Sequence, residues 1–141
     1  MIAYITLVLS ALTLVADKPE GDLARFQGTW KVARMEINAK PQRLAFAVKV
    51  MFEGDKLFAV VGNRAPEPKG TFKIDPSQAL KTYDVTTPEG LLSRGIYRLE
   101  GDTLTVCLAG HDGERPNTFT TKPDDGRTLL VYQKEKPASA P

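Results

Sequence analysis

Residues 95–108 read GIYRLEGDTLTVCL, two alternating apolar and polar runs on either side of the dipeptide Gly101-Asp102. Gly-Asp suits a two-residue hairpin loop, because glycine accepts the positive φ that the first central position requires. The resulting register pairs Glu100 with Thr103, Leu99 with Leu104, and Tyr97 with Val106. It gathers Tyr97, Leu99, Leu104, Val106 and Leu108 on one face, and leaves Arg98, Glu100, Thr103, Thr105 and Cys107 on the other.

Residues 53–57, EGDKL, repeat the form of residues 100–104, EGDTL. The same two-residue loop pairs Phe52 with Leu57 and Val50 with Ala59, which again collects one apolar face. That face consists of Val48, Val50, Phe52, Leu57, Ala59 and Val61. A sheet with one apolar face must be covered by a second sheet or curl on itself, and consecutive hairpins favour the curled form.

Short strands separated by turn residues are predicted along the rest of the chain. They are Thr29–Ile37, Val48–Glu53, Lys56–Val61, Gly70–Asp75, Thr82–Thr87, Ser93–Glu100, Thr103–Ala109, Thr118–Lys122 and Arg127–Lys134. A short helical turn is expected at Asp22–Gln27, a loop at Asn63–Lys69, and a hairpin turn at Asp124-Asp125-Gly126. The sequence therefore predicts an all-β fold, an antiparallel up-and-down barrel of about eight or nine strands with a short N-terminal helical turn.

The composition is that of one ordinary globular domain. The chain has 141 residues, of which 42% are hydrophobic and 26% charged, and its formal net charge is +2. These values argue against disorder, and no block of Lys and Arg indicates a nucleic-acid partner.

Residues 1–16, MIAYITLVLSALTLVA, are uncharged and short for a membrane span, but their length suits a signal peptide. A buried N-terminal strand is the alternative. With cleavage after Ala16, residues 17–135 form the barrel domain, and Lys136–Pro141 form a tail with little apolar content to bury. The expected location is secreted or periplasmic, in the cell envelope, with no membrane span once the leader is removed.

Three motifs resemble a known family. FQGTW at residues 26–30 contains a G-x-W element, residues 95–107 fit GIYxLxGDTLxxC, and residues 115–119 fit RPxxF. Together they resemble small exported bacterial lipocalin-like domains, a family without an established activity, over nearly the whole chain after the leader. The resemblance implies a closed barrel in which Trp30 closes one end beneath the helix, often against a basic side chain. Arg115 is a candidate for that polar contact at the barrel end.

Catalytic, metal and cofactor sites are not predicted. Cys107 and His111 are the only pair of the nucleophile–base type, but His111 would have to fold back towards Cys107, whose side chain is expected either buried or on the outer face. His111, Asp112 and Glu114 lie in a turn with the single histidine of the chain, and Asp124-Asp125 also lies in a turn. We therefore expect a protein that is not an enzyme.

Two functions remain open. The first is binding of a small apolar or amphipathic ligand in the barrel, and the second is a solid-cored cell-envelope module that meets a protein partner. Bulky residues are expected to face the barrel interior or line a ligand site. They are Trp30, Val50, Phe52, Leu57, Phe72, Tyr97, Leu99, Leu104, Val106 and Phe119.

Overall fold

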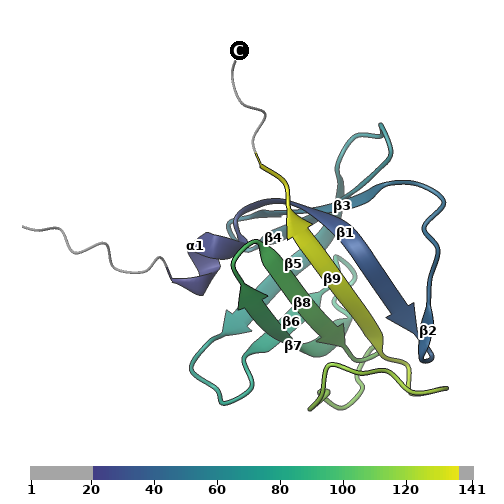
Figure 1. The fold of residues 1–141 in the computed structure, drawn as a ribbon. Helices are drawn as coiled ribbons and strands as arrows, with labels where there is room; N and C mark the ends of the chain where they lie inside the picture. Colours follow the sequence, from purple (N-terminus) through teal and green to yellow (C-terminus); the bar gives the residue numbers. More distant parts are fainter. Residues whose placement is uncertain (1–20, 137–141) are drawn as a thin grey trace, which may run out of the picture.

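Eight antiparallel strands close into a barrel in the computed structural model, which describes residues 21–136 (Figure 1). One short helix and one additional strand complete the described part of the chain. The elements are α1 Asp22–Phe26, β1 Gly28–Ile37, β2 Lys40–Pro41, β3 Val48–Glu53, β4 Lys56–Val61, β5 Glu67–Asp75, β6 Thr82–Thr86, β7 Leu92–Glu100, β8 Thr103–Leu108 and β9 Thr128–Lys134. The predicted leader (1–16) and the tail beyond residue 136 lie outside the described residues.

The closure depends on β1, which pairs with β3 on one side and with β9 on the other. The remaining strands follow in chain order from β3 to β9, each paired with the next. This is the up-and-down order that the sequence predicted. A β-bulge at Ala33, where the β1–β9 register shifts between Val32 and Arg34, bends β1 as it crosses from one partner to the other.

Both Gly-Asp hairpins have the predicted register. Glu100 lies opposite Thr103 and Glu53 opposite Lys56, and Gly54 and Gly101 adopt φ values of 61° and 56°. The apolar face of each hairpin points into the barrel, where Phe52, Leu57, Tyr97, Leu104 and Val106 join one core. The hairpin motif therefore sets which side chains are inside.

Two strands, β5 and β2, differ from the prediction. β5 begins at Glu67 rather than Gly70, so the predicted loop at Asn63–Lys69 is wrong in part. Pro68 is tolerated in the strand because the β4–β5 register shifts there, between Leu57 and Phe58. The unpredicted strand β2 forms a short hairpin with β1, whose turn places Asn38 and Ala39 at positive φ.

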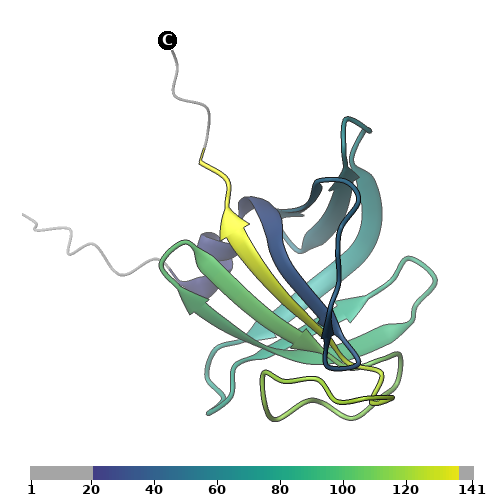
Figure 2. The same cartoon turned by 45° about the vertical axis from the view of Figure 1, so that its right-hand side comes forward.

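The predicted strand Thr118–Lys122 is also wrong. Since β9 already has β8 on one side and β1 on the other, the closed sheet has no edge left for another strand. Residues 109–127 instead form a long connection from β8 to β9, which we call the strap (Figure 2). Asp125 makes a turn there, accepting hydrogen bonds from the backbone of Lys122 and Arg127, but it does not join two strands.

Candidate functional site

The α1 end of the barrel is filled by aromatic rings. Phe26 projects from α1 into the barrel and is fully buried, within 5.0–5.9 Å, centroid to centroid, of four other rings. These belong to Phe52, Phe72, Tyr83 and Tyr97, each at most 5% exposed. This half of the barrel has no room for a ligand without displacing a ring.

The FQGTW motif joins the helix to this end. Trp30 Nε1 donates a hydrogen bond of 2.8 Å to the Phe26 carbonyl, and Gln27 exchanges two hydrogen bonds with the backbone of Gly54 in the β3–β4 turn. Lys134 Nζ lies 5.2 Å from the Trp30 ring and binds the Arg25 carbonyl. The free carbonyls at the end of α1 are thus satisfied by side chains of the barrel. The cation over Trp30 is therefore Lys134 rather than Arg115.

Asp22 fixes the outer side of α1 through a small polar network. Tyr97 donates a hydrogen bond of 2.7 Å to Asp22 Oδ2, and the Lys81 ammonium donates one of 2.9 Å to the same oxygen. Burial opposes ionisation of the carboxyl, but these two bonds and the charge of Lys81 outweigh it, so the pKa of Asp22 lies below its ordinary value. The network therefore fixes α1 at this end of the barrel, and it offers no free reactive group.

The contacts of the strap account for the GIYxLxGDTLxxC and RPxxF motifs. Ile96 and Cys107 point outwards from the barrel, yet both are fully buried because Phe119 of the strap and Leu129 of β9 pack against them. Pro116 is fully buried as well. Phe119 therefore lies on the outer wall, and its predicted position inside the barrel is wrong. Burial raises the pKa of the Cys107 thiol, so this cysteine is neither accessible nor activated.

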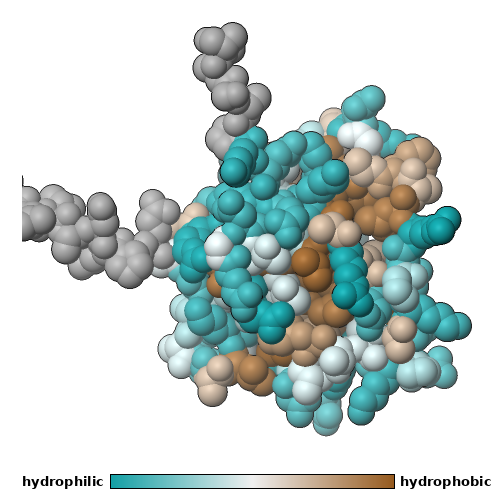
Figure 3. Space-filling view, viewed as in Figure 1, coloured by the Kyte–Doolittle hydropathy of each residue, from teal (hydrophilic) through white to brown (hydrophobic). Residues whose placement is uncertain are grey.

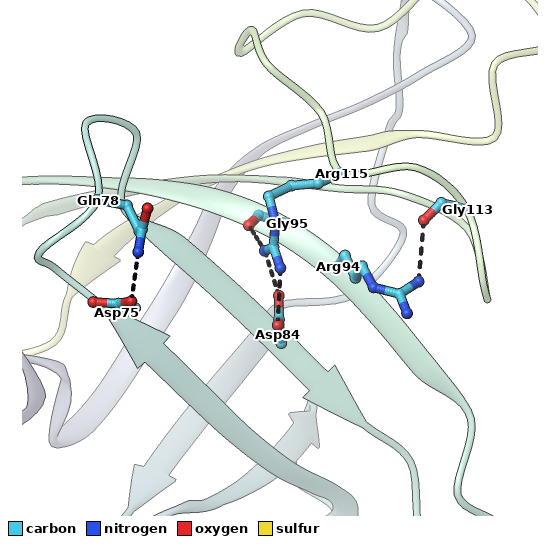
Figure 4. A network of polar contacts seen from close by, with 7 residues as sticks. All are labelled: Asp75, Gln78, Asp84, Arg94, Gly95, Gly113 and Arg115. Carbon is cyan, nitrogen blue, oxygen red and sulfur yellow. Dashed lines mark hydrogen bonds and ion pairs between the residues drawn. The ribbon is translucent and has the colours of Figure 1, made fainter.

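Arg115 anchors the strap to β6 and β7 (Figure 4). Its guanidinium donates to both carboxylate oxygens of Asp84 and, at 2.7 Å, to the Gly95 carbonyl. A Cβ on residue 95 would lie 2.6 Å from the Cys107 carbonyl, so glycine is needed there. Nearby, Arg94 reaches the Gly113 carbonyl of the strap. The contact of Arg115 is thus structural and lies on the outer wall, not at the Trp30 end.

The titratable groups of the described residues form no recognisable catalytic set. His111 Nδ1 lies 3.1 Å from the Ser93 hydroxyl, while the Cys107 sulfur lies 3.8 Å from the Thr120 carbonyl under the strap. Within residues 21–136, no three His, Cys, Asp or Glu side chains are close enough to hold a metal ion. No helix of this part of the chain is long and apolar enough to cross a membrane.

The barrel end opposite α1 has a different character. Its inward-facing side chains are apolar and only half-buried, among them Met35 and Val48. Three apolar side chains are exposed beside them: Phe46 by 69%, Leu44 by 39% and Val61 by 36%. Figure 3 shows hydrophobic side chains gathered on this face, next to the loop that joins β2 to β3.

Two hollows meet at Phe46. One, of about 330 Å³, lies between residues 31–35 of β1 and residues 42–48, and the other, of about 370 Å³, is lined by Val61–Arg64. Both volumes fall at the lower end of the range for ligand pockets. The sequence did not indicate Phe46 or Leu44, although two large apolar residues in a segment outside any predicted strand are an available signal.

The other residues that the sequence assigned to the interior or to a ligand site lie in or against the core. Trp30, Val50, Phe52, Leu57, Phe72, Tyr97, Leu99, Leu104 and Val106 all belong to the barrel core or pack against it. Most of them fill space near α1, and the half-buried Val50 lies opposite Trp30 in the β1–β3 ladder.

Comparison of the chain with protein-family models, curated proteins and solved structures gave no match. The resemblance to exported lipocalin-like domains therefore rests on the three motifs and stays a prediction.

Proposed function

We propose that this domain is a binding protein for a small apolar or amphipathic ligand, which it holds at the barrel end opposite α1. The observation that carries the proposal is the exposure of Phe46, Leu44 and Val61 beside half-buried aliphatic residues of the interior. Exposed aromatic and aliphatic side chains around a concave surface are typical of ligand sites. A binding role rather than a catalytic one is also supported by the burial of Cys107 beneath the strap.

The test is a titration with phenylnaphthylamine, an uncharged dye that fluoresces in apolar sites. We expect saturable binding to the native domain and a loss of affinity of about tenfold in Phe46→Ser, because burying one large side chain contributes about 1.5–3 kcal/mol. Leu80→Ser is the matched control, since Leu80 is 43% exposed at the α1 end. Absence of saturable binding, or equal losses in the two variants, would contradict the proposal.

The second candidate is a solid-cored envelope module that meets a protein. The observation in its favour is the aromatic packing that fills the α1 half of the barrel. Failure of the dye to bind would leave this candidate in place of the first.

We also propose that the domain acts outside the cytoplasm, either secreted or in the periplasm. The uncharged stretch of residues 1–16 supports this location. N-terminal sequencing of the exported protein is expected to find a chain that begins at Asp17. A mature chain that still begins at Met1 or Ile2 would contradict cleavage.

A further inference from the structure

The hollow beside β1 lies where the hydrogen-bonded ladder between β1 and the chain that follows it is interrupted. β1 pairs with β3 only from Gly28 to Lys31, and with β2 only at Glu36 and Ile37. Gln42 still donates a backbone hydrogen bond of 2.8 Å to the Met35 carbonyl, but between it and β3 the chain of residues 43–47 bulges away from β1, as Figures 1 and 2 both show. We call this opening the slot.

Side chains of both barrel faces line the slot. Val32 belongs to the barrel core, and Met35 and Val48 pack against it, so these three point inwards. Lys31 and Arg34 are exposed, as expected for the outward positions of a strand. The slot is therefore apolar towards the interior and basic towards the solvent.

The charged side chains that line the slot itself are basic. Lys31 and Arg34 are the only charged residues that line the slot, and the neighbouring hollow adds Arg64. Arg34 binds Glu36 at 3.0 Å, whereas no carboxylate among residues 21–136 lies within ion-pair distance of Lys31. Lys31 lies directly opposite Lys49 across the β1–β3 ladder, and Lys49 is already paired with Glu135 at 2.6 Å. Lys31 is therefore the lysine of this pair that has no carboxylate partner among residues 21–136.

The apolar surface continues outwards from the slot. Phe46 lines both the slot and the neighbouring hollow, and it is the most exposed of the large hydrophobic residues in the described chain. A ligand that covers Phe46 and enters the slot would meet Met35 and Val48 at its apolar end and Lys31 at its outer end. Such a ligand has an apolar chain and a single negatively charged head.

We propose that the slot binds a single-chain amphiphile with an anionic head group, with the chain between β1 and Phe46 and the head at Lys31. This inference rests on the proposed function and deepens it, because it names the ligand's charge and orientation. Arg34 is already paired with Glu36, so we assign the head group to Lys31.

The test is displacement of bound phenylnaphthylamine by three probes of equal chain length, all below their micelle concentrations. The probes are dodecanoate, dodecanol and dodecyltrimethylammonium, which carry a negative, a neutral and a positive head. We expect dodecanoate to displace the dye best, and its advantage to shrink as salt is added, since the head group lies at the surface.

Lys31→Gln is expected to weaken dodecanoate about fivefold, the upper range for an exposed ion pair, and to leave dodecanol unchanged. Lys31→Arg should restore the preference for dodecanoate. Lys56→Gln is the matched control, because Lys56 is an exposed lysine at the β3–β4 turn, the α1 end of the barrel. A preference that survives in Lys31→Gln would overturn the assignment of the head group.

The outcomes separate the two proposals. Equal displacement by all three probes would overturn the anionic head group and leave apolar binding intact. Absence of dye binding would overturn both. A third outcome would also overturn this inference: the protein sediments with anionic vesicles, but monomeric dodecanoate does not displace the dye. The surface would then bind a membrane instead of a single molecule.

Discussion

Phe26 packs edge-on against Phe52 and Tyr97, with centroid distances of 5.2 and 5.0 Å, and stacks on Phe72 and Tyr83. Replacing it with alanine would leave a cavity that neighbouring β-strands cannot collapse to fill. We expect Phe26→Ala to lower the free energy of unfolding by about 3–5 kcal/mol. Leu23→Ala in the same helix is the control, because Leu23 is 51% exposed and should change stability by less than about 0.5 kcal/mol. Denaturant unfolding measures both, and similar losses would contradict the role of Phe26 as a plug.

Arg115 also contributes to the stability of the fold as a single residue, through its ion pair with Asp84. Asp84 retains only 27% exposure of its side chain, and Arg115 satisfies both of its oxygens. Arg115→Gln would leave this half-buried carboxylate without its cation, so we expect a loss of about 1–3 kcal/mol. Arg64→Gln is the control, an exposed arginine without an ion pair among the described residues, and should cost little. In a double-mutant cycle, Asp84→Asn should recover part of the loss, and strict additivity would show that the pair is not coupled.

At the scale of elements, the strap separates Cys107 from solvent. The thiol is fully buried, and its raised pKa makes the reactive thiolate rare. We expect Cys107 to react with a disulfide reagent only when the strap opens, much more slowly than in the unfolded chain. Phe119→Ala should accelerate the reaction, because it removes the strap residue that packs on the outer apolar cluster.

Phe58→Ala is the control for this experiment, since Phe58 is a half-buried residue of β4 at an outward position. If both variants accelerated modification equally, global unfolding rather than local opening of the strap would account for the reactivity.

The same elements show which parts of the fold the local sequence pattern can predict. The two Gly-Asp loops determine register and the inward face, because a slip of one residue would put Arg98 beside Leu104. Residues 118–122, TFTTK, have the threonine and aromatic content typical of a strand, but whether such a segment finds a partner depends on edges that the β1–β9 pairing removes. Ile96 and Cys107 on the outward face were a signal that something covers that wall.

The candidate site was less predictable than the fold. Phe46 and Lys31 come together because β1 leaves β3 after Lys31, which is a property of barrel closure and not of either segment alone. The FQGTW motif indicated a closed end, and the contacts of Gln27 and Trp30 explain it physically. Sequence pattern therefore located the sealed end of the molecule better than the open one.

At the scale of the whole molecule, alkaline pH tests whether the barrel unfolds as one unit. Three of the four tyrosines, Tyr83, Tyr97 and Tyr132, are buried in the core. Burial raises the pKa of all three well above the ordinary value, and for Tyr97 the hydrogen bond to Asp22 raises it further. A group whose pKa is higher in the folded state stabilises that state fully below its unfolded pKa, and the contribution is lost as pH rises. Stability should therefore fall above about pH 10, the ordinary pKa of tyrosine.

We expect the tyrosinate absorbance of a chain beginning at Asp17 to appear in one cooperative step, together with the loss of near-ultraviolet circular dichroism. Ionisation of Tyr83 inside an intact barrel would place a charge beside Phe26, Phe52 and Phe72, so we expect unfolding to accompany it. Tyr97→Phe keeps the ring and removes one titrating hydroxyl, and it should make the decline of stability with pH shallower. A gradual titration at unchanged dichroism would contradict the cooperative step, because it would mean that hydroxide reaches these hydroxyls while the aromatic end of the barrel remains folded.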